Sequence, residues 1–314
     1  MSLNDIMSVL VKVMLMKETH VKPNREAPSK MAEGIAMQRF RESSKSEDDR
    51  ICYDPYAIHF INPEIVEFGI KHPEEAEARV EAMENQLPGL SSSIIARVRY
   101  FDDIVTESIG EGLEQLVILG AGYDTRAYRI EGLDENVKVF EVDHPNTQNF
   151  KKEKIIEIFR SLPDHVTYVP IDFETQKLGP VLFENGYNKS VKTLFIMEGL
   201  IMYIPPEAVN ETLNFIANNS GKGSQIIFDY YPESVVDGTT ARAVGQNIRK
   251  FLIQLGEPLQ FGIKEGTSEK FLSSYGFSKI QTVTSANYKK AYFEGKNKNR
   301  EVCDLLYFAH AVVE

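Results

Sequence analysis

The sequence of 314 residues has few cysteines, no apolar run long enough to span a membrane, and a deficit of positive charge. Its two cysteines, Cys52 and Cys303, lie far apart, and neither has a second cysteine or a histidine at metal-ligand spacing. This pattern argues against a disulfide scaffold and against a structural zinc site. We therefore expect no bound metal and a reducing, cytoplasmic location.

Positive charge is scarce, because 35 Lys and Arg residues stand against 46 Asp and Glu residues, for a net charge of −11. A surface this acidic repels phosphate backbones, so nucleic acid is a poor candidate partner. The apolar stretch "DIMSVLVKVMLM" (5–16) is too short to cross a bilayer and lacks the features of a signal peptide. We expect it to form a helix packed on its own domain and no membrane association, with a homodimer contact as the alternative.

From residue 116 onward, short β-branched runs alternate with amphipathic stretches, which is typical of a mostly parallel α/β sheet. The predicted strands cover residues 114–120, 137–143, 166–172, 191–198 and 224–231, and a last strand falls within 301–314. Residues 205–223 begin with prolines and end at glycine, which predicts a helix. Further predictions are a helix within 239–258 and a helix followed by a strand within 267–285, whereas the polar stretch 41–50 is predicted to be a loop.

These elements indicate two regions of the chain. Residues 1–110 are predicted to form a helical cap region, and residues 111–314 a cofactor-binding α/β domain with a helical insertion at about 232–265. Open α/β sheets bind ligands at the carboxyl ends of their strands. We therefore expect the cap and the insertion to cover that edge as a lid.

The stretch "LVILGAGYDTRAYRI" (116–130) contains a glycine turn directly after the first strand. Gly120 and Gly122 allow a ligand to approach the backbone closely. A dinucleotide fingerprint would have a third glycine where Thr125 stands, and Asp124 would repel a pyrophosphate. The turn therefore disfavours NAD and an oxidoreductase.

Three acidic residues stand at the ends of consecutive predicted strands: Asp143, Asp172 and Glu198. Asp143 can accept hydrogen bonds from ribose hydroxyls, and Asp172 from an adenine amino group while Phe173 packs on the ring. A cofactor with a ribose, a positive charge and no phosphate fits this set. The predicted cofactor is S-adenosyl-L-methionine.

The motifs resemble those of the leucine carboxyl methyltransferase family, class I S-adenosyl-L-methionine-dependent enzymes that include phosphatase methyltransferases and polyketide O-methyltransferase-like proteins. The similar segments are "DPYA" (54–57), "ARVRYFDD" (96–103), "LGAGYDTRAYR" (119–129), "FEVDHP" (140–145), "VPIDF" (169–173) and "EGLIMYIP" (198–205). A lysine that precedes "DPY" in the phosphatase-directed members has no clean match here among Arg39, Arg41 and Lys45. The chain thus resembles the bacterial branch that acts on small molecules.

The resemblance implies a Rossmann-like sheet of seven strands whose last strand is antiparallel. It also implies roles for site residues. Arg97 would hold the carboxylate of the cofactor, and Glu198 would lie near its amino acid moiety and methyl group. Gly120 and Gly122 would form the turn beneath the methionine part, Asp143 would bind the ribose, and Asp172 with Phe173 the adenine.

We expect methyl transfer to an oxygen of a small, anionic molecule, because a carboxylate acceptor is ionised at neutral pH and needs no base. The catalytic residues stay unknown, with Tyr203 and Arg126 as weak candidates. A hydroxyl acceptor would need a base, for which His144 and Tyr203 are nearest. Cations for the acceptor could come from Arg126, or from Arg99, Arg129, Arg242 and Arg249. A protein that binds the cofactor without catalysis, as a regulator, is the alternative.

Overall fold

The computed structural model describes residues 29–173 and 175–314, so the predicted helix over residues 5–16 lies outside them. Within this part of the chain, seven strands form one sheet in the order β3-β2-β1-β4-β5-β7-β6. All of the predicted strands are confirmed. The strands are β1 (Gln115–Leu119), β2 (Lys138–Asp143), β3 (Val166–Pro170), β4 (Thr193–Met197), β5 (Gln225–Tyr230), β6 (Phe277–Val283) and β7 (Tyr307–Val313).

The first five strands run parallel, and β7 pairs antiparallel with both β5 and β6. Every residue of β1, β4 and β5 is buried, as expected for parallel strands covered on both faces. The fold class predicted from the sequence, a mostly parallel seven-stranded sheet with an antiparallel last strand, is therefore confirmed.

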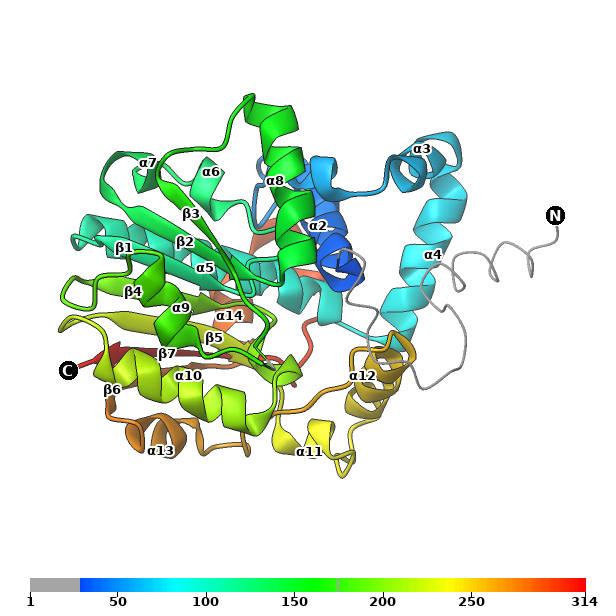
Figure 1. The fold of residues 1–314 in the computed structure, drawn as a ribbon. Helices are drawn as coiled ribbons and strands as arrows, with labels where there is room; N and C mark the ends of the chain where they lie inside the picture. The colour runs from blue at the N-terminus through cyan, green and yellow to red at the C-terminus, as the bar shows by residue number, and fades with distance from the viewer. Residues whose placement is uncertain (1–28, 174) are drawn as a thin grey trace.

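Helices cover both faces of the sheet (Figure 1). Alternate residues of β1 point to opposite faces, so that Leu116 and Ile118 belong to one apolar cluster and Val117 and Leu119 to another. The first face packs against α5 (Leu90–Gly110), α6 (Arg126–Arg129), α7 (Leu133–Asn136) and α14 (Ser285–Tyr292). The second face packs against α9 (Leu178–Glu184), α10 (Pro206–Asn218) and α13 (Ser268–Ser273).

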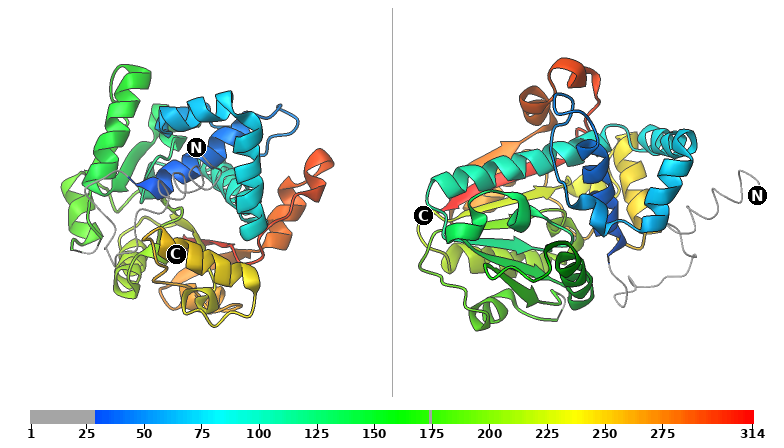
Figure 2. Two further views of the ribbon diagram at one scale, coloured as in Figure 1. Left: turned by 90° about the vertical axis from the view of Figure 1, so that its right-hand side faces the viewer. Right: turned by 90° about the horizontal axis from the view of Figure 1, so that it is seen from above.

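The remaining helices gather near the ends of the parallel strands, on the side away from the C-terminus in Figure 1 and facing the viewer in the left view of Figure 2. The cap consists of α2 (Lys30–Ser43), η1 (Ala57–Phe60), α3 (Pro63–Lys71) and α4 (Pro73–Gln86). The insertion contains α11 (Glu233–Val236) and α12 (Ala243–Gln254). Three further elements complete the described chain: α8 (Pro145–Phe159), after β2, η2 (Ile201–Tyr203), after β4, and η3 (Gly295–Asn299).

Two predictions about the helical additions need comment. The predicted loop at 41–50 is wrong for its first three residues, because α2 continues to Ser43 and buries Glu42 against Arg300 and Lys45. The division at residue 110 stays a prediction, although α5 lies before it and contributes a long buried face to the sheet.

In the described ranges, 29–173 and 175–314, the helices are all too short or too polar to cross a membrane. Over the same residues, no group of three or more His, Cys, Asp or Glu side chains is arranged to hold a metal ion.

Candidate active site

The turn after β1 brings two glycines to the carboxyl edge of the sheet. Gly120 and Gly122 have φ angles of 65° and 44°, in the left-handed region that favours glycine. A Cβ atom on Gly120 would lie 2.9 Å from a side-chain carbon of Leu200, and one on Gly122 would lie 3.3 Å from Ala32 in α2. Backbone conformation and close packing therefore both select glycine in this turn.

The three predicted strand-end acids come to the same edge as the glycine turn. Asp143 is the last residue of β2, Asp172 follows β3, and Glu198 comes directly after β4. Strands β3, β2, β1 and β4 are consecutive neighbours in the sheet and run in the same direction. The acids therefore form a row along one edge, with the glycine turn between Asp143 and Glu198.

Asp143 is tied directly to the glycine turn. One carboxylate oxygen accepts the backbone N–H of Gly122, and the other accepts the backbone N–H of His144 at 2.5 Å. Burial raises the pKa of Asp143, and the two N–H donors only partly offset this. Each carboxylate oxygen has a second lone pair, so Asp143 can also accept from a ligand hydroxyl.

Asp172 and Phe173 lie at the neighbouring strand end. The backbone N–H of Asp172 donates to Oε1 of Gln176 at 3.0 Å. Phe173 is half-buried and packs against the apolar cluster on the α9–α10 face of the sheet. Asp172 and Phe173 thus lie at the end of the strand next to that of Asp143. The sequence predicted that these two residues contact the adenine.

Arg97 of α5 crosses the edge of the sheet and joins two acids. Its Nε atom is 3.1 Å from Glu198, and its Nη1 atom is 2.7 Å from Asp229 of β5. Asp229 also accepts the backbone N–H of Gly199 at 2.6 Å. Burial opposes the charge on Arg97, but Asp229 and Glu198 outweigh it and raise the pKa of the guanidinium above its ordinary value.

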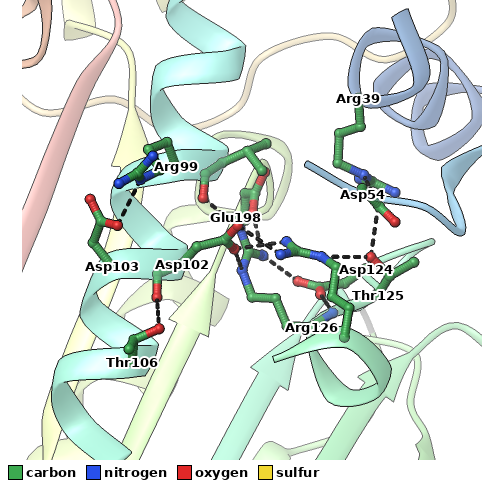
Figure 3. Close-up of polar contacts among 12 residues, drawn as sticks. Arg39, Asp54, Arg99, Asp102, Asp103, Thr106, Asp124, Thr125, Arg126 and Glu198 are labelled. Atoms are coloured by element: carbon green, nitrogen blue, oxygen red, sulfur yellow. Dashed lines mark hydrogen bonds and ion pairs between the residues drawn. The ribbon is translucent and has the colours of Figure 1, made fainter. Parts of the chain in front are cut away.

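Arg126 lies at the centre of a second group of acids (Figure 3). Its nitrogens contact Asp102 at 2.7 Å and Glu198 at 2.6 Å, and they also pair with Asp124. The third nitrogen donates to the backbone oxygen of Val98. Burial opposes ionisation of Glu198, yet Arg126 and Arg97 together lower its pKa. With all three nitrogens engaged, Arg126 is suited to ordering the site and poorly suited to gripping an acceptor.

Arg39 of α2 attaches the cap to the glycine turn. Its Nε atom is 2.8 Å from Asp54, and its Nη2 atom donates to the backbone oxygen of Tyr123 at 2.5 Å. Asp54 in turn accepts the hydroxyl of Thr125 at 2.7 Å. Because these contacts are buried, the cap and the turn form a single polar unit. We call Arg39, Asp54 and Thr125 the cap latch.

The two predicted bases are poorly placed for proton abstraction. Burial raises the pKa of Tyr203, and Glu257 and Asp229 raise it further, so its phenol stays protonated at neutral pH. Nδ1 of His144 accepts the backbone N–H of Asn146 at 3.4 Å, which makes this histidine the N-terminal cap of α8. Neither observation supports a role for these two residues as a general base.

The other predicted cations fall into two groups. Arg129 is bonded through two nitrogens to Asp102, each at 2.8 Å, and thus belongs to the buried site. The remaining three lie outside it: Arg99 pairs with Asp103, Arg242 lies near Glu265 and Asp304, and Arg249 donates to the backbone oxygen of Val236.

Sequence reasoning missed several acids of the site. Asp54 and Asp102 fall within motifs quoted above but received no role, and Asp229 stands within an apolar strand. The signal for Asp229 was available, because a carboxylate inside a fully buried strand requires a partner.

A cavity of about 350 Å³ lies inside the cap, between α2, α4 and α5. Its lining includes Arg41, Glu77, Glu84, Ser92 and Arg300. None of its lining residues belongs to the glycine turn or to the strand ends. It is therefore a feature of the cap and is separate from the row of acids.

Comparison with known proteins identifies the family of this site. A family model described as "Leucine carboxyl methyltransferase" matches residues 32–217, from α2 almost to the end of α10. A relative from Bacillus subtilis (strain 168), named "Putative S-adenosyl-L-methionine-dependent methyltransferase YktD", is 30% identical over 81% of this chain and 82% of its own length. A similarly named protein from Mycolicibacterium smegmatis is 29% identical over 76% of this chain and 78% of its own.

Solved structures agree on the fold. A DUF574 family protein from Streptomyces avermitilis has a TM-score of 0.56 at 13% identity, covering 93% of this chain and 99% of that chain. A structure from Thermobifida fusca, described as a methyltransferase, has a TM-score of 0.55 at 16% identity and covers 93% of this chain and 98% of that one. The predicted family and the predicted cofactor, S-adenosyl-L-methionine, are confirmed at the level of the family. The chain belongs to the leucine carboxyl methyltransferase family of S-adenosyl-L-methionine-dependent methyltransferases.

Proposed function

We propose that this protein transfers the methyl group of S-adenosyl-L-methionine to an oxygen of a small anionic molecule, with a carboxylate as the preferred acceptor. The observation that carries the proposal is the row of Asp172, Asp143, the glycine turn and Glu198 along adjacent strand ends, beneath the cap. Four elements distant in sequence supply these groups to one edge, where α/β sheets bind their ligands.

The charge of the site suits this cofactor. Three arginines (Arg97, Arg126 and Arg129) are paired with four carboxylates (Asp102, Asp124, Glu198 and Asp229), which leaves one negative charge in excess. S-adenosyl-L-methionine carries a sulfonium, an ammonium and a carboxylate, so its net charge is positive and complements the excess. A pyrophosphate would instead meet the buried Asp124, which argues against a dinucleotide.

Each group has a part in holding the cofactor. Asp143 would accept from the ribose hydroxyls, and Asp172 with Phe173 would contact the adenine. Gly120 and Gly122 would leave room for the methionine part, and Glu198 would face its ammonium. Arg97 would contact its carboxylate through Nη2, which makes no hydrogen bond to the described residues.

The chemistry requires little of the protein beyond orientation. The sulfonium, when bound, supplies an activated methyl group that an oxygen nucleophile can attack in line. An ionised carboxylate acceptor needs no proton removed, which accords with the protonated phenol of Tyr203 and the capping role of His144. The residues of the site therefore bind, orient and exclude water.

Transfer of a labelled methyl group tests the proposal. The protein is incubated with a small-molecule extract and S-adenosyl-L-methionine labelled in the methyl group. We expect label in a product that mild base releases as methanol, because methyl esters hydrolyse and methyl ethers do not. Base-stable label would contradict carboxylate methylation, and binding of the cofactor without any transfer would favour the regulatory alternative.

Asp143→Ala tests the cofactor half of the site separately, by a binding measurement. Removing the carboxylate leaves the ribose hydroxyls unpaired, which should weaken binding of S-adenosylhomocysteine by about 1–3 kcal/mol in calorimetry. An unchanged affinity would remove Asp143 from the site.

A further inference from the structure

A buried ion pair lies beneath the row of acids, outside the groups assigned above. Glu141 of β2 and Lys151 of α8 approach to 2.8 Å, and both side chains are only 1% exposed. Figure 1 shows α8 beside the strands β2 and β3. Side chains two apart on a strand share a face, so Glu141 points to the same side of β2 as Asp143.

The fold alone does not explain this pair. Removing two charges from water costs several kcal/mol per ion, and an apolar pair of similar volume often stabilises a protein as well or better. Lys151 and Tyr128 both act on the carboxylate of Glu141 as side-chain hydrogen-bond partners, and Nζ of Lys151 lies 2.8 Å from its Oε2 atom.

The surroundings of Lys151 connect it to the site. Phe150, next to Lys151 on α8, packs against Tyr123 of the glycine turn, with ring centroids 5.4 Å apart. The charge of Lys151 also acts to lower the pKa of Asp124 and of Asp143. The ring of Tyr128 from α6 lies 5.7 Å from Nζ. Lys151 is thus a buried cation on the helix that packs against the glycine turn, and it is paired with a carboxylate two residues before Asp143.

We propose that Glu141 and Lys151 form a positioning pair, in which the buried ion pair joins α8 to β2 beside the glycine turn and so keeps Asp143 oriented toward the ribose. This inference rests on the proposed function, because it assigns the pair to the ribose half of that site. Both residues act through Asp143 and touch no substrate.

The test uses a variant that should fold. Replacing Lys151 alone would leave Glu141 buried without a partner, so the main variant is the double substitution Glu141→Leu with Lys151→Met. Lys154→Met is the matched control, since Lys154 lies on the same helix and pairs with Glu157 at 2.8 Å on the surface. Binding of S-adenosylhomocysteine and of its 2′-deoxyribose analogue is measured by calorimetry across a range of pH.

We expect the double variant to bind S-adenosylhomocysteine at least tenfold more weakly and to lose most of its preference over the 2′-deoxy analogue. The acid limb of its affinity profile should move to higher pH, because a cation that favours the ionised form of Asp143 is gone. The N–H groups of Gly122 and His144 and the imidazole of His144 also favour the ionised form of Asp143. Tyr123 is a further neighbour, and the charge of Asp143 helps to raise the pKa of its phenol. The control should behave as the wild type does.

Two results would overturn the inference. One is a folded double variant with wild-type affinity and wild-type preference. If the double variant does not fold, Glu141→Gln, which conserves the shape of the side chain, is used in its place. Wild-type affinity and wild-type preference in that variant would then overturn the inference. Failure of the wild-type protein to bind S-adenosylhomocysteine would contradict the proposed function itself, and so is distinguishable from failure of the pair.

Discussion

Arg126, among the buried acids beside the glycine turn, and Arg242, in the insertion, are held in the protein in opposite ways. Arg126 is 2% exposed and contacts acids at 2.6 and 2.7 Å. Arg242 is 42% exposed and lies 3.1 and 3.8 Å from Glu265 and Asp304, which are themselves open to solvent. Both residues were candidates to bind an anionic acceptor, but only Arg242 has a guanidinium that a ligand could reach without breaking buried pairs.

The largest expected effect comes from breaking the buried cluster. Arg126→Met would leave Asp102, Asp124 and Glu198 without their shared cation, and an uncompensated buried charge costs about 3–5 kcal/mol. Urea unfolding of the variant should show a loss of that size in the free energy of unfolding. A loss below about 1 kcal/mol would mean that the cluster is hydrated and behaves as a surface network does.

A smaller difference in stability between the buried acids near Arg126 and the exposed acids of the insertion should appear at low pH. Burial opposes ionisation of Asp124, but Arg126 lowers its pKa from 3.8 to about 2. A carboxylate with a lowered folded-state pKa stabilises the protein above its unfolded pKa, and this contribution disappears as the pH falls toward the folded value. Asp124 should therefore contribute about 2 kcal/mol above pH 4 that is lost on acidification.

The pH dependence is measured by urea unfolding of wild type and Asp124→Asn over the acid range. The two curves should converge as the pH falls, because the wild type alone loses the contribution of Asp124. Parallel curves would place the acid sensitivity elsewhere, and Asp237→Asn provides a comparison on the insertion, where the carboxylate is solvent-exposed.

The smallest effect is expected in the insertion. Arg242→Ala removes an exposed cation with long ion-pair distances, which typically changes the free energy of unfolding by about 0–1 kcal/mol. The same variant should raise the KM for an anionic acceptor while leaving the affinity for S-adenosylhomocysteine unchanged. If the cofactor affinity changed instead, the insertion would belong to the cofactor half of the site and the comparison would fail.

Much of the sheet was predictable, because fully buried parallel strands appear as continuous apolar runs with polar residues at their ends. Asp143, Asp172 and Glu198 were found for the same reason, since each stands where such a run stops. An acid inside a run gives a weaker signal, and Glu141 and Asp229 were missed for that reason.

The partners of these acids could not be predicted from local pattern. Arg97 and Asp229 are 132 residues apart, and Arg39 and Tyr123 are 84 apart, so only the folded chain joins them. The row of acids at the strand ends follows from the order and direction of the strands. The ion pairs depend instead on how helices pack against strands, and no sequence motif specifies the packing angles. The acceptor half of the proposed site, which we expect the cap and the insertion to form, belongs to the second kind.

The cap latch has a consequence for how ligands enter and leave. Arg39 and Asp54 exchange contacts with the backbone and the hydroxyl of the turn itself, so α2 cannot move away from the sheet without disturbing Tyr123 and Thr125. If the cap opens, the glycine turn that we propose to hold the cofactor should therefore be disturbed at the same time. Cap opening would then weaken binding of the reacted cofactor at the same time as it lets that cofactor leave. A new cofactor molecule would be bound fully only after the cap has closed over it.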